Sequence, residues 1–328
     1  MSTVIFLRHK TLGQNSIEEL AASLQQGISQ VVLKTFPAPS ATIWGMLKNI
    51  AFAIKHAGEV NHLAAPVESY VLPFMRGKKV VTWHDVSTAL QSRSRLKKFL
   101  RFNVSMRWPM RYADRIVAIS ESTRRELESI YPQGAAKIRV IPNSYNRLFT
   151  YSPARSTLET PPPIILHIGT ARRKNLERVI PALEGIDCIL RIVGRLSAEQ
   201  NLLLDKHQIS FTQESDVSLE RIIELYRESD IISFPSLYEG FGMPVIEAGA
   251  IGRPVVSSRS GAIPEIAQDS VCYVDPEDIS SIRSGFLRII HEENYRKELI
   301  EKGRSNAQRY SPAHMCSAYA DLYESLSR

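Results

Sequence analysis

The sequence predicts an α/β protein of two doubly wound domains, each built on a parallel sheet. Short apolar runs alternate with amphipathic segments along most of the chain, as successive strand–helix units do. Between residues 150 and 163 the alternation is interrupted by four prolines among small polar residues, and then it restarts. A length of 328 residues also suits two domains of about 150 residues each. Domains of this kind bind ligands at the carboxyl ends of their strands, so we expect a ligand cleft between them.

The first half of the chain contains six short apolar runs that are typical of buried parallel strands. A helix is expected after the first run. Ser120 is expected to cap a second helix, because its hydroxyl can accept from the free N–H groups of a first turn. The expected strands are residues 4–7, 31–33, 60–63, 79–83, 115–119 and 138–141, and the expected helices are residues 16–24 and the segment that begins at 121.

The second half repeats this pattern and ends in a series of helices. The expected strands are residues 164–168, 188–193, 231–234, 255–256 and 271–274. The expected helices are residues 175–183, 218–228, a helix with Pro244 at its first position, 264–267, 279–292, 294–309 and 312–326. The last helix is amphipathic and is expected to pack back on the first half. We therefore predict domains at residues 1–152 and 153–311, with residues 312–328 returning to the first domain.

The net charge of +7 conceals an asymmetry between the two halves. Residues 1–150 carry 21 Lys and Arg against 9 Asp and Glu, whereas residues 151–328 carry 20 against 25. A basic half indicates an anionic partner, such as an acidic substrate, a membrane surface or nucleic acid. Nucleic acid is not expected here, because no recognised nucleic-acid-binding motif accompanies the charge.

The three cysteines are far apart, and no histidine stands at metal-ligand spacing from them. A disulfide framework and a zinc site are therefore not expected, and a reducing compartment fits. The first apolar run has four residues, too few for a signal peptide, and the longest apolar stretch, residues 43–54, is broken by Lys48 and Asn49. We expect a cytoplasmic protein, with peripheral contact to the inner face of the cell membrane as a further option.

The most informative segment of the chain runs from Ser233 to Glu247. It places Glu239 in a loop with two glycines after an expected strand, and Glu247 in the first turn of the next helix. Glycines let a backbone approach a ligand, and the free N–H groups at a helix start favour phosphate. Helical side chains lean toward the N-terminus, so both carboxylates can face one crevice. The segment predicts a site for a ligand with phosphates and hydroxyls.

This segment closely resembles the donor-site signature of retaining GT-B glycosyltransferases of family 4. The resemblance lies in the order Glu-Gly-Phe-Gly-x-Pro-x-x-Glu-Ala from residue 239, followed by Gly-Arg-Pro-Val-Val at 252–256. In that family, two glutamates with seven residues between them form the E-x7-E element. The resemblance implies a GT-B fold, in which two Rossmann-like domains face each other across a cleft. It also implies that the first domain binds the acceptor and that the second binds a nucleotide-sugar donor.

The resemblance assigns donor-site roles to residues of the second half. The loop Gly-Thr-Ala-Arg-Arg-Lys-Asn-Leu at 169–176 is similar to the family element whose Arg and Lys neutralise the leaving diphosphate. Arg173 and Lys174 would clamp the diphosphate, with Arg172 as the alternative to Arg173. Glu247 would accept from ribose hydroxyls, and Glu239 would hold the sugar. The other implied donor-site residues are Gly169, Gly194, Gly240, Phe241, Gly242, Met243 and Val245.

The resemblance extends to a His-Asp pair that follows an expected strand of the first half. It implies that His84 contacts the donor sugar and helps to stabilise an oxocarbenium-like transition state. Asp85 would orient the imidazole or receive an acceptor hydroxyl. Gly13 is assigned to the donor site, although many family members carry a Gly-Gly pair there. His62 and Arg124 are placed on the acceptor side, although a structural role is the more usual one for a histidine such as His62.

Residues 91–115 hold eight basic residues interleaved with leucine, phenylalanine, methionine and tryptophan. A basic amphipathic surface with aromatic side chains suits peripheral contact with an anionic membrane. A solvated helix face is the alternative interpretation.

From the resemblance we expect a retaining glycosyltransferase of the hexosyltransferase type. It would move a sugar from a UDP- or GDP-sugar to a hydroxyl of a glycan or lipid-linked acceptor, in surface polysaccharide or lipopolysaccharide synthesis. The chain has no Asp-x-Asp motif, so neither a metal ion nor another cofactor is expected. Two alternatives stay open: a nucleotide-sugar epimerase of the same fold, which needs no acceptor, and a non-catalytic GT-B subunit, which has no physical need for Glu239, Glu247 and Lys174.

Overall fold

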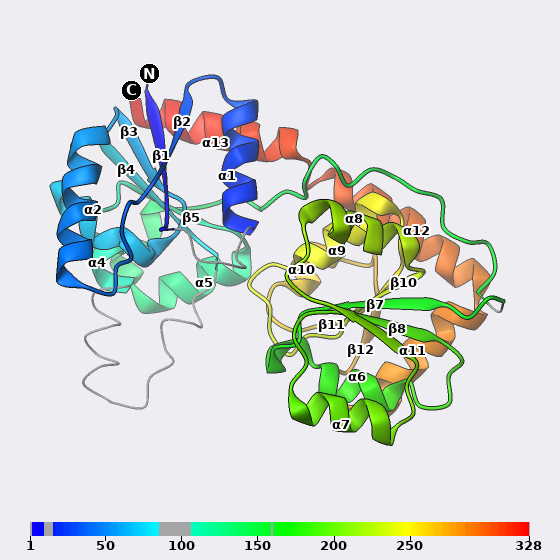
Figure 1. Cartoon of the computed structure of the whole chain (residues 1–328). Helices are drawn as coiled ribbons and strands as arrows, with labels where there is room; N and C mark the ends of the chain where they lie inside the picture. The colour runs from blue at the N-terminus through cyan, green and yellow to red at the C-terminus, as the bar shows by residue number, and fades with distance from the viewer. Residues whose placement is uncertain (1, 10–15, 85–105, 159, 328) are drawn as a thin grey trace. The chain divides into compact units, whose positions relative to one another are not determined.

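The computed structural model describes the whole chain except residues 1, 10–15, 85–105, 159 and 328. The chain forms two compact units, Met1–Asn146 with Pro312–Arg328, and Arg147–Ser311 (Figure 1). The boundary comes earlier than the one expected after residue 152. Phe149 packs edge-on against Tyr226, with ring centroids 5.4 Å apart, and therefore belongs to the second unit.

The first unit is built on a parallel sheet with the strand order β2-β1-β3-β4-β5-β6. Strand β1 lies between β2 and β3, so the order reverses beside it and the sheet is doubly wound. The strands are β1 (Thr3–Leu7), β2 (Val31–Thr35), β3 (Val60–Leu63), β4 (Lys78–Trp83), β5 (Arg115–Ala118) and β6 (Ile138–Val140).

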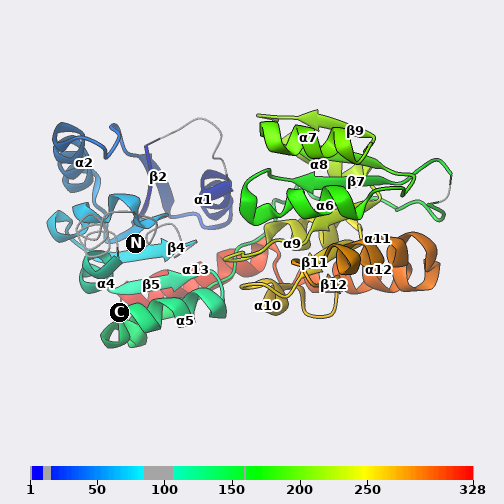
Figure 2. The ribbon, with the colours of Figure 1, turned by 90° about the horizontal axis from the view of Figure 1, so that it is seen from below.

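Successive residues of β1 point to opposite faces of this sheet, and each face is covered by its own helices. Val4 and Phe6 pack in one cluster with residues of α2, η1, α4 and α5, and Ile5 and Leu7 pack in another with residues of α1 and α13 (Figures 1 and 2). The helices are α1 (Ser16–Gly27), α2 (Ile43–His56), η1 (Pro66–Phe74), α4 (Trp108–Tyr112), α5 (Glu121–Ile130), η4 (Pro132–Lys137) and α13 (Pro312–Ser327).

The second unit has a parallel sheet with the order β12-β11-β10-β7-β8-β9. Its order reverses between β7 and β10, which pair with each other although two strands separate them in the sequence. The strands are β7 (Ile164–Ile168), β8 (Ile189–Val193), β9 (Phe211–Glu214), β10 (Ile231–Phe234), β11 (Val255–Ser258) and β12 (Cys272–Val274).

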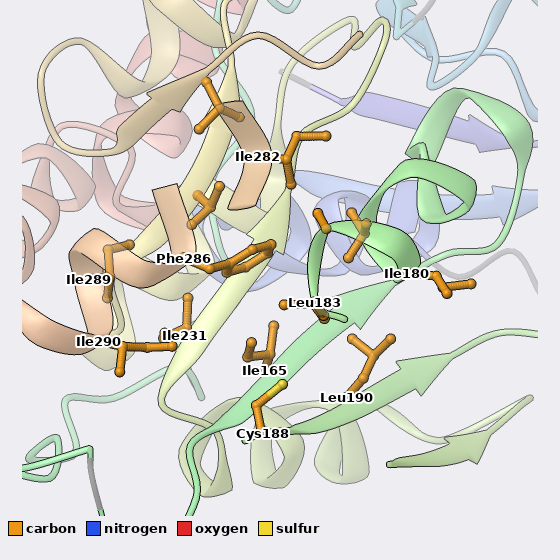
Figure 3. Close-up of a cluster of buried hydrophobic side chains, with 14 of the residues drawn as sticks. Ile165, Ile180, Leu183, Cys188, Leu190, Ile231, Ile282, Phe286, Ile289 and Ile290 are labelled. Atoms are coloured by element: carbon orange, nitrogen blue, oxygen red, sulfur yellow. The ribbon is translucent and has the colours of Figure 1, made fainter. Parts of the chain in front are cut away.

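Helices cover both faces of the second sheet as well. Figure 3 shows one buried cluster, in which Phe286 of α11 lies close to Ile165 of β7 and Ile231 of β10, all fully buried. The helices are η5 (Arg172–Lys174), α6 (Leu176–Ala182), α7 (Ala198–Lys206), α8 (Leu219–Glu228), α9 (Met243–Ile251), α10 (Ile263–Ala267), α11 (Ile279–His291) and α12 (Glu293–Gln308).

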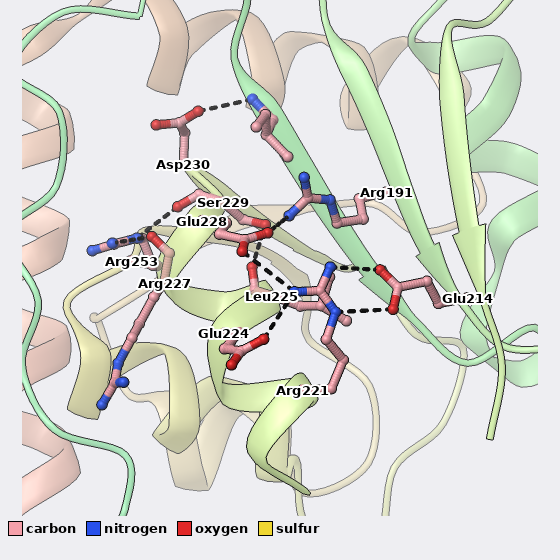
Figure 4. A network of polar contacts seen from close by, with 11 residues as sticks. Arg191, Glu214, Arg221, Glu224, Leu225, Arg227, Glu228, Ser229, Asp230 and Arg253 are labelled. Atoms are coloured by element: carbon pink, nitrogen blue, oxygen red, sulfur yellow. Dashed lines mark hydrogen bonds and ion pairs between the residues drawn. The ribbon is translucent and has the colours of Figure 1, made fainter. Parts of the chain in front are cut away.

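The edge strand β9 pairs with β8, and ion pairs join it to α8. Arg221 of α8 donates to both carboxylate oxygens of Glu214, at 2.8 and 2.9 Å, and also pairs with Glu228 (Figure 4). Most residues of β9 are exposed. The sequence analysis did not predict this strand, because its single apolar residue, Phe211, gives no alternating pattern.

Helices α2 and α7 were also missing from the prediction. Helix α2 falls on the apolar stretch at 43–54, and its start is capped by Thr42, whose hydroxyl accepts from the N–H of Gly45 at 3.0 Å. Helix α7 begins with a capping box formed by Ser197 and Gln200. That Ser-x-x-Gln signal is present in the sequence and marks a helix start.

Helices α9 and α12 pack against each other through two glycines. A Cβ atom on Gly249 would lie 2.4 Å from the carbonyl oxygen of Gly303, whereas a Cβ atom on Gly303 would find its nearest neighbour, Gly249 Cα, at 3.5 Å. The contact therefore tolerates a side chain on one helix only.

We predict that Gly249→Ala lowers the free energy of unfolding by about 1–3 kcal/mol, because the helices must move apart. Gly303→Ala should change it little, or raise it by up to about 1 kcal/mol through the higher helix propensity of alanine. Urea unfolding followed by circular dichroism measures both. Equal losses in the two variants would contradict the observed asymmetry.

Candidate functional site

Two loops leave the second sheet side by side at its switch point. One follows β7 and contains Gly169 and the turn η5, and the other follows β10 and contains Glu239. Because β7 and β10 are parallel neighbours, both loops emerge at the same edge. The N–H of Leu237 donates to the carbonyl oxygen of Arg173 at 2.8 Å and ties the loops together.

The glycines at this edge allow close approach of the backbone. Gly169 has a φ of +93°, and a Cβ atom there would lie 3.0 Å from Cγ of Lys174. Gly194, at the end of β8, has a φ of +138°, and a Cβ atom would lie 2.9 Å from Cγ2 of Thr170. Both positions need glycine, because the backbone has a positive φ and a Cβ atom would lie too close to a neighbouring side chain.

A nearly buried carboxylate and two cations form the centre of the site. Glu239 Oε1 lies 2.7 Å from Lys174 Nζ, and Glu239 Oε2 lies 2.9 Å from Arg173 Nη1. The Glu239 side chain is 8% exposed and that of Lys174 15%, whereas that of Arg173 is 48% exposed. Arg172 is exposed and takes part in no ion pair within the described residues. The structure thus brings three of the predicted residues together.

The charge of Lys174 depends on its acidic neighbours. Burial lowers the pKa of Lys174, and the carboxylates of Glu239 and Glu247 oppose that shift. Lys174 Nζ also lies 4.7 Å from the centroid of the Phe234 ring. A cation held in so little water interacts more strongly with an anion than one on the surface does.

The second glutamate of the motif is held by a tyrosine that the sequence analysis missed. Tyr226 of α8 is fully buried, and its hydroxyl donates to Glu247 Oε2 at 2.7 Å. Burial, together with the charge of Glu247, raises the pKa of Tyr226 well above its ordinary value, so the phenol stays protonated. Nothing in the sequence marks this residue, because an aromatic side chain at core spacing in a helix is common.

Helix α9 presents its N-terminus at the same edge. Gly242 is its N-cap, with a φ of +115°, and no side chain caps the first turn. The helix begins at Met243, so Pro244 is at its second position rather than the first, as had been expected. The Val245 N–H donates to the carbonyl oxygen of Gly242, which leaves the N–H groups of Gly242 and Met243 for an anion.

Three other predicted donor-site residues occupy the same loop and helix. Phe241 is buried against Tyr310, with ring centroids 5.7 Å apart, so only its backbone can face a ligand. Val245 is buried and its N–H is bonded, so it supports the loop from the core, in contrast to the predicted donor contact. Gly240 is partly exposed beside Glu239.

Backbone contacts hold the Glu239 loop in place. The carbonyl oxygen of Glu239 accepts from the N–H of Ala262 at 2.9 Å, and a Cβ atom on Gly261 would lie 2.2 Å from that oxygen. Asn175, which has a φ of +67°, donates from its side chain to the carbonyl oxygens of Pro235 and Pro276. The sequence analysis gave Asn175 no role in the site, because a left-handed backbone is not visible in the sequence.

The turn after β8, which contains the predicted donor-site residue Gly194, is braced by side chains. Gln213 donates to the carbonyl oxygen of Gly194 at 2.7 Å, and Thr170 donates to that of Arg195 at 2.7 Å. Arg195 pairs with Asp216 on the surface.

In the first unit, His84 follows β4 and is neutral near pH 7. Its Nε2 lies 2.9 Å from the carbonyl oxygen of Ala64, so this nitrogen carries the proton and Nδ1 is left as an acceptor. Burial lowers the pKa of His84 to about 4. The imidazole therefore carries no charge with which to interact with a cationic transition state.

His62 has a structural role, which corrects its expected place on the acceptor side. It is buried, and its two ring nitrogens lie 2.7 Å from the hydroxyls of Tyr323 and Thr82. With both nitrogens bonded, it has no group to offer a substrate. It joins β3 and β4 to α13 instead.

The remaining predicted residues of the first unit are Arg124, Gly13 and Asp85. Arg124 is 42% exposed and pairs with Glu128 and Glu121 on its own helix. Gly13 and Asp85 lie outside the described residues. Ser120 caps α5 as predicted, accepting from the N–H of Thr123 at 3.0 Å.

Solved structures of similar shape show which fold this is. The chain superposes on sucrose-phosphate synthase from Thermosynechococcus elongatus with a TM-score of 0.81 at 19% identity, covering 99% of each chain. It superposes on HepE of Anabaena, in complex with UDP and glucose, with a TM-score of 0.82 at 16% identity, covering 99% of this chain and 100% of HepE. The fold is GT-B, as predicted.

Two family models match nearly adjacent parts of the sequence. The model described as Glycosyltransferase Family 4 matches residues 16–147, and the model described as Glycosyl transferases group 1 matches residues 151–306. The chain belongs to the GT-B glycosyltransferases of the family 4 type. The chain is 24% identical to the O-antigen chain mannosyltransferase B of Escherichia coli over 79% of this chain and 73% of that protein. An α-(1→4)-mannosyltransferase of Mycolicibacterium hassiacum is 30% identical, over 38% of this chain and 36% of its own length.

Two further observations concern the described part of this glycosyltransferase. No helix there has the length and apolar character to cross a bilayer. In the same residues, His, Cys, Asp and Glu side chains nowhere gather in threes as metal ligands do.

Buried histidines give a prediction about pH. Burial lowers the pKa of His62 and of His167 to about 3, whereas an unfolded imidazole titrates near 6.5. The unfolded state therefore binds more protons between these values, so stability is complete above about pH 6.5 and is lost as the pH falls toward 3. At pH 5 each of these two histidines should lower the free energy of unfolding by roughly 2 kcal/mol relative to its value at neutral pH.

Urea unfolding at pH 7.5 and 5.0 tests this in His167→Gln, which should lose less stability on acidification than the wild type. His291→Gln, at an exposed position of α11, is the matched control and should behave as the wild type. An equal pH dependence in all three proteins would contradict the prediction.

Proposed function

We propose that this glycosyltransferase moves a sugar from a nucleotide diphosphate donor to a hydroxyl of a glycan or lipid-linked acceptor, with retention at the anomeric carbon and without a metal ion. The observation that carries the proposal is the cluster of Glu239, Lys174 and Arg173 at the switch point of the second sheet. Cations beside a free helix N-terminus fit a diphosphate, and two carboxylates fit the hydroxyls of a sugar and a ribose.

The cluster suggests how the donor would be received. Without a ligand, Glu239 accepts from both cations. A bound diphosphate would accept from Lys174 and Arg173 in place of Glu239. The Glu239 carboxylate would then be able to accept from a sugar hydroxyl. As the glycosidic bond to the phosphate breaks, charge grows on the leaving oxygen, and cations already in place stabilise it.

The second carboxylate would bind the ribose. Tyr226 occupies one oxygen of Glu247, which fixes the carboxylate and directs the other oxygen to a partner. His84 would contact the donor sugar as predicted. A neutral imidazole suits this place, because it does not repel positive charge that develops on the sugar ring.

The acceptor class is proposed from the relatives and the charge. The similar Escherichia coli protein acts on the O-antigen chain. WaaG is involved in lipopolysaccharide biosynthesis. The chain superposes on WaaG with a TM-score of 0.73 at 17% identity, covering 97% of this chain and 99% of WaaG. Residues 1–150 carry the excess of basic side chains, which suits an anionic or lipid-linked acceptor. We place the protein in the cytoplasm, in contact with the inner membrane surface. The predicted membrane contact through residues 91–115 lies mostly outside the described residues.

Nucleotide binding tests the proposal first. Thermal unfolding with UDP, GDP, ADP, CMP and dTDP should show stabilisation by one of them, by roughly 2.7 kcal/mol at about 100 times its dissociation constant. Lys174→Ala should remove that shift and sugar transfer together, whereas Lys206→Ala, at an exposed position of α7, should keep both. Retention of transfer in Lys174→Ala would refute the site.

Tyr226→Phe should raise the KM for the donor roughly tenfold, because Glu247 loses a hydrogen bond from a buried hydroxyl. The ribose contact is the same in the ground state and the transition state, so kcat should change little. Tyr273→Phe, which removes a hydroxyl bonded to the carbonyl oxygen of Gln268, is the control. Steady-state kinetics with varied donor concentration measure KM and kcat separately. A fall in kcat at constant KM would contradict the prediction.

A further inference from the structure

Helix α2 of the first unit presents its large apolar side chains to solvent. Ile43 is 77% exposed, Trp44 76%, Leu47 51% and Ile54 52%. The helix packs against the core through Met46, Ile50 and Phe52, and it buries Gly45, Asn49 and Ala53. The opposite side, which is polar in a usual amphipathic helix, is therefore apolar in α2 and uncovered.

This rotation of α2 is fixed by contacts on its inner side. The side chain of Asn49 accepts from the N–H of Ala38 and donates to the carbonyl oxygen of Ala38 and to the hydroxyl of Tyr70. A Cβ atom on Gly45 would lie 2.2 Å from the carbonyl oxygen of Pro39. Turning the helix to bury Trp44 would break the bonds of Asn49 and place a side chain where only glycine fits.

The exposed residues form one stripe along the helix. They recur at intervals of three or four residues, as neighbours on one face of a helix do: Trp44, Leu47, Lys48, Ala51, Ile54 and Lys55. The only formal charges on α2 are the two lysines, and no acidic residue lies on it. The stripe is therefore apolar with a positive margin.

The neighbouring elements share this character. η1 packs against α2 and exposes Val67 and Phe74, and α4 packs against η1 and exposes Trp108 and Tyr112. Arg111 of α4 is exposed. The one carboxylate on these three elements, Glu68, is buried and accepts from Ser40.

We propose that the exposed stripe of α2 docks on a lipid bilayer that contains anionic phospholipid. Tryptophan, leucine and isoleucine beside lysines, with no exposed acid, match an interface that is apolar inside and negative at its surface. The stripe itself lies on α2, outside residues 91–115, where a membrane contact was predicted from the sequence; of the neighbouring elements only α4 falls in that range. The proposal does not depend on the donor site, because vesicle binding requires no nucleotide.

Vesicle co-sedimentation of the whole chain tests the proposal. The wild type should bind vesicles of phosphatidylcholine with about one third phosphatidylglycerol and should bind pure phosphatidylcholine much less. Trp44→Ser and Leu47→Ser should each lower the partition coefficient roughly tenfold. Lys48→Gln and Lys55→Gln should each lower it roughly fivefold.

Leu202→Ser is the matched control, because Leu202 is 70% exposed on α7 of the second unit. It should bind as the wild type does. Absence of wild-type binding to the anionic vesicles, or equal weakening by Leu202→Ser and Trp44→Ser, would overturn the proposal. So would a wild-type dimer that Trp44→Ser converts to a monomer without changing vesicle binding, since the stripe would then join two copies of the chain.

Fluorescence locates the contact within the molecule. The chain has three tryptophans, and Trp83 is fully buried, so Trp108→Phe leaves Trp44 as the exposed one. Its emission should shift to the blue on vesicle binding, and phospholipid brominated in its acyl chains should quench it. An unchanged Trp44 spectrum in protein that sediments with the vesicles would refute α2 as the docking element.

Discussion

The carboxylate of Glu239, held between Lys174 and Arg173, is the interaction on which the site in the second unit depends. A carboxylate with so little exposure is stable only beside opposite charge, and a lysine as covered as Lys174 needs the same. The pair therefore holds the loop after β7 against the loop after β10. The backbone N–H of Leu237 also ties these two loops together, and that of Ala262 holds the Glu239 loop from the segment after β11. Both cations are thus held at this edge of the sheet by the protein itself, as the stabilisation proposed for a leaving diphosphate would require.

The arrangement of this site follows from features that are visible in the sequence. Alternating strands and helices predict a parallel sheet, and the loops at its switch point then converge by topology. The particular order around Glu239 and Glu247 identified the loop, and the basic run at 172–174 identified its partner. Tyr226 and Asn175 could not be found in this way. The role of Tyr226 depends on which residues tertiary packing brings within reach, and that of Asn175 depends on a left-handed backbone angle. Neither can be inferred from the spacing of residues in the sequence.

The sequence was least informative where one residue pattern is compatible with two different structural arrangements. An apolar stretch at 43–54 indicates an element, but it does not tell which face turns inward, and in α2 this was decided by Asn49 and Gly45. His62 and His84 both belong to strands or follow them directly. The family resemblance implied a contact with the donor sugar for His84, whereas for His62 a place on the acceptor side was set against the more usual structural role. The partners of their ring nitrogens distinguish them, since His62 has two side-chain hydroxyls and His84 has one carbonyl oxygen.

The place of α13 has a consequence for the order in which the chain can fold. Its Tyr323 and Tyr319 bond with His62 and Thr82 in the interior of the first unit, so that interior is complete only with residues from the last turns of the helix. The second unit, Arg147–Ser311, is continuous in sequence and is synthesised in full before α13. On the ribosome, the unit that begins first is therefore the one that finishes last. Until α13 arrives, the apolar residues of β1 and α1 that it covers stay open to chaperones or to other nascent chains.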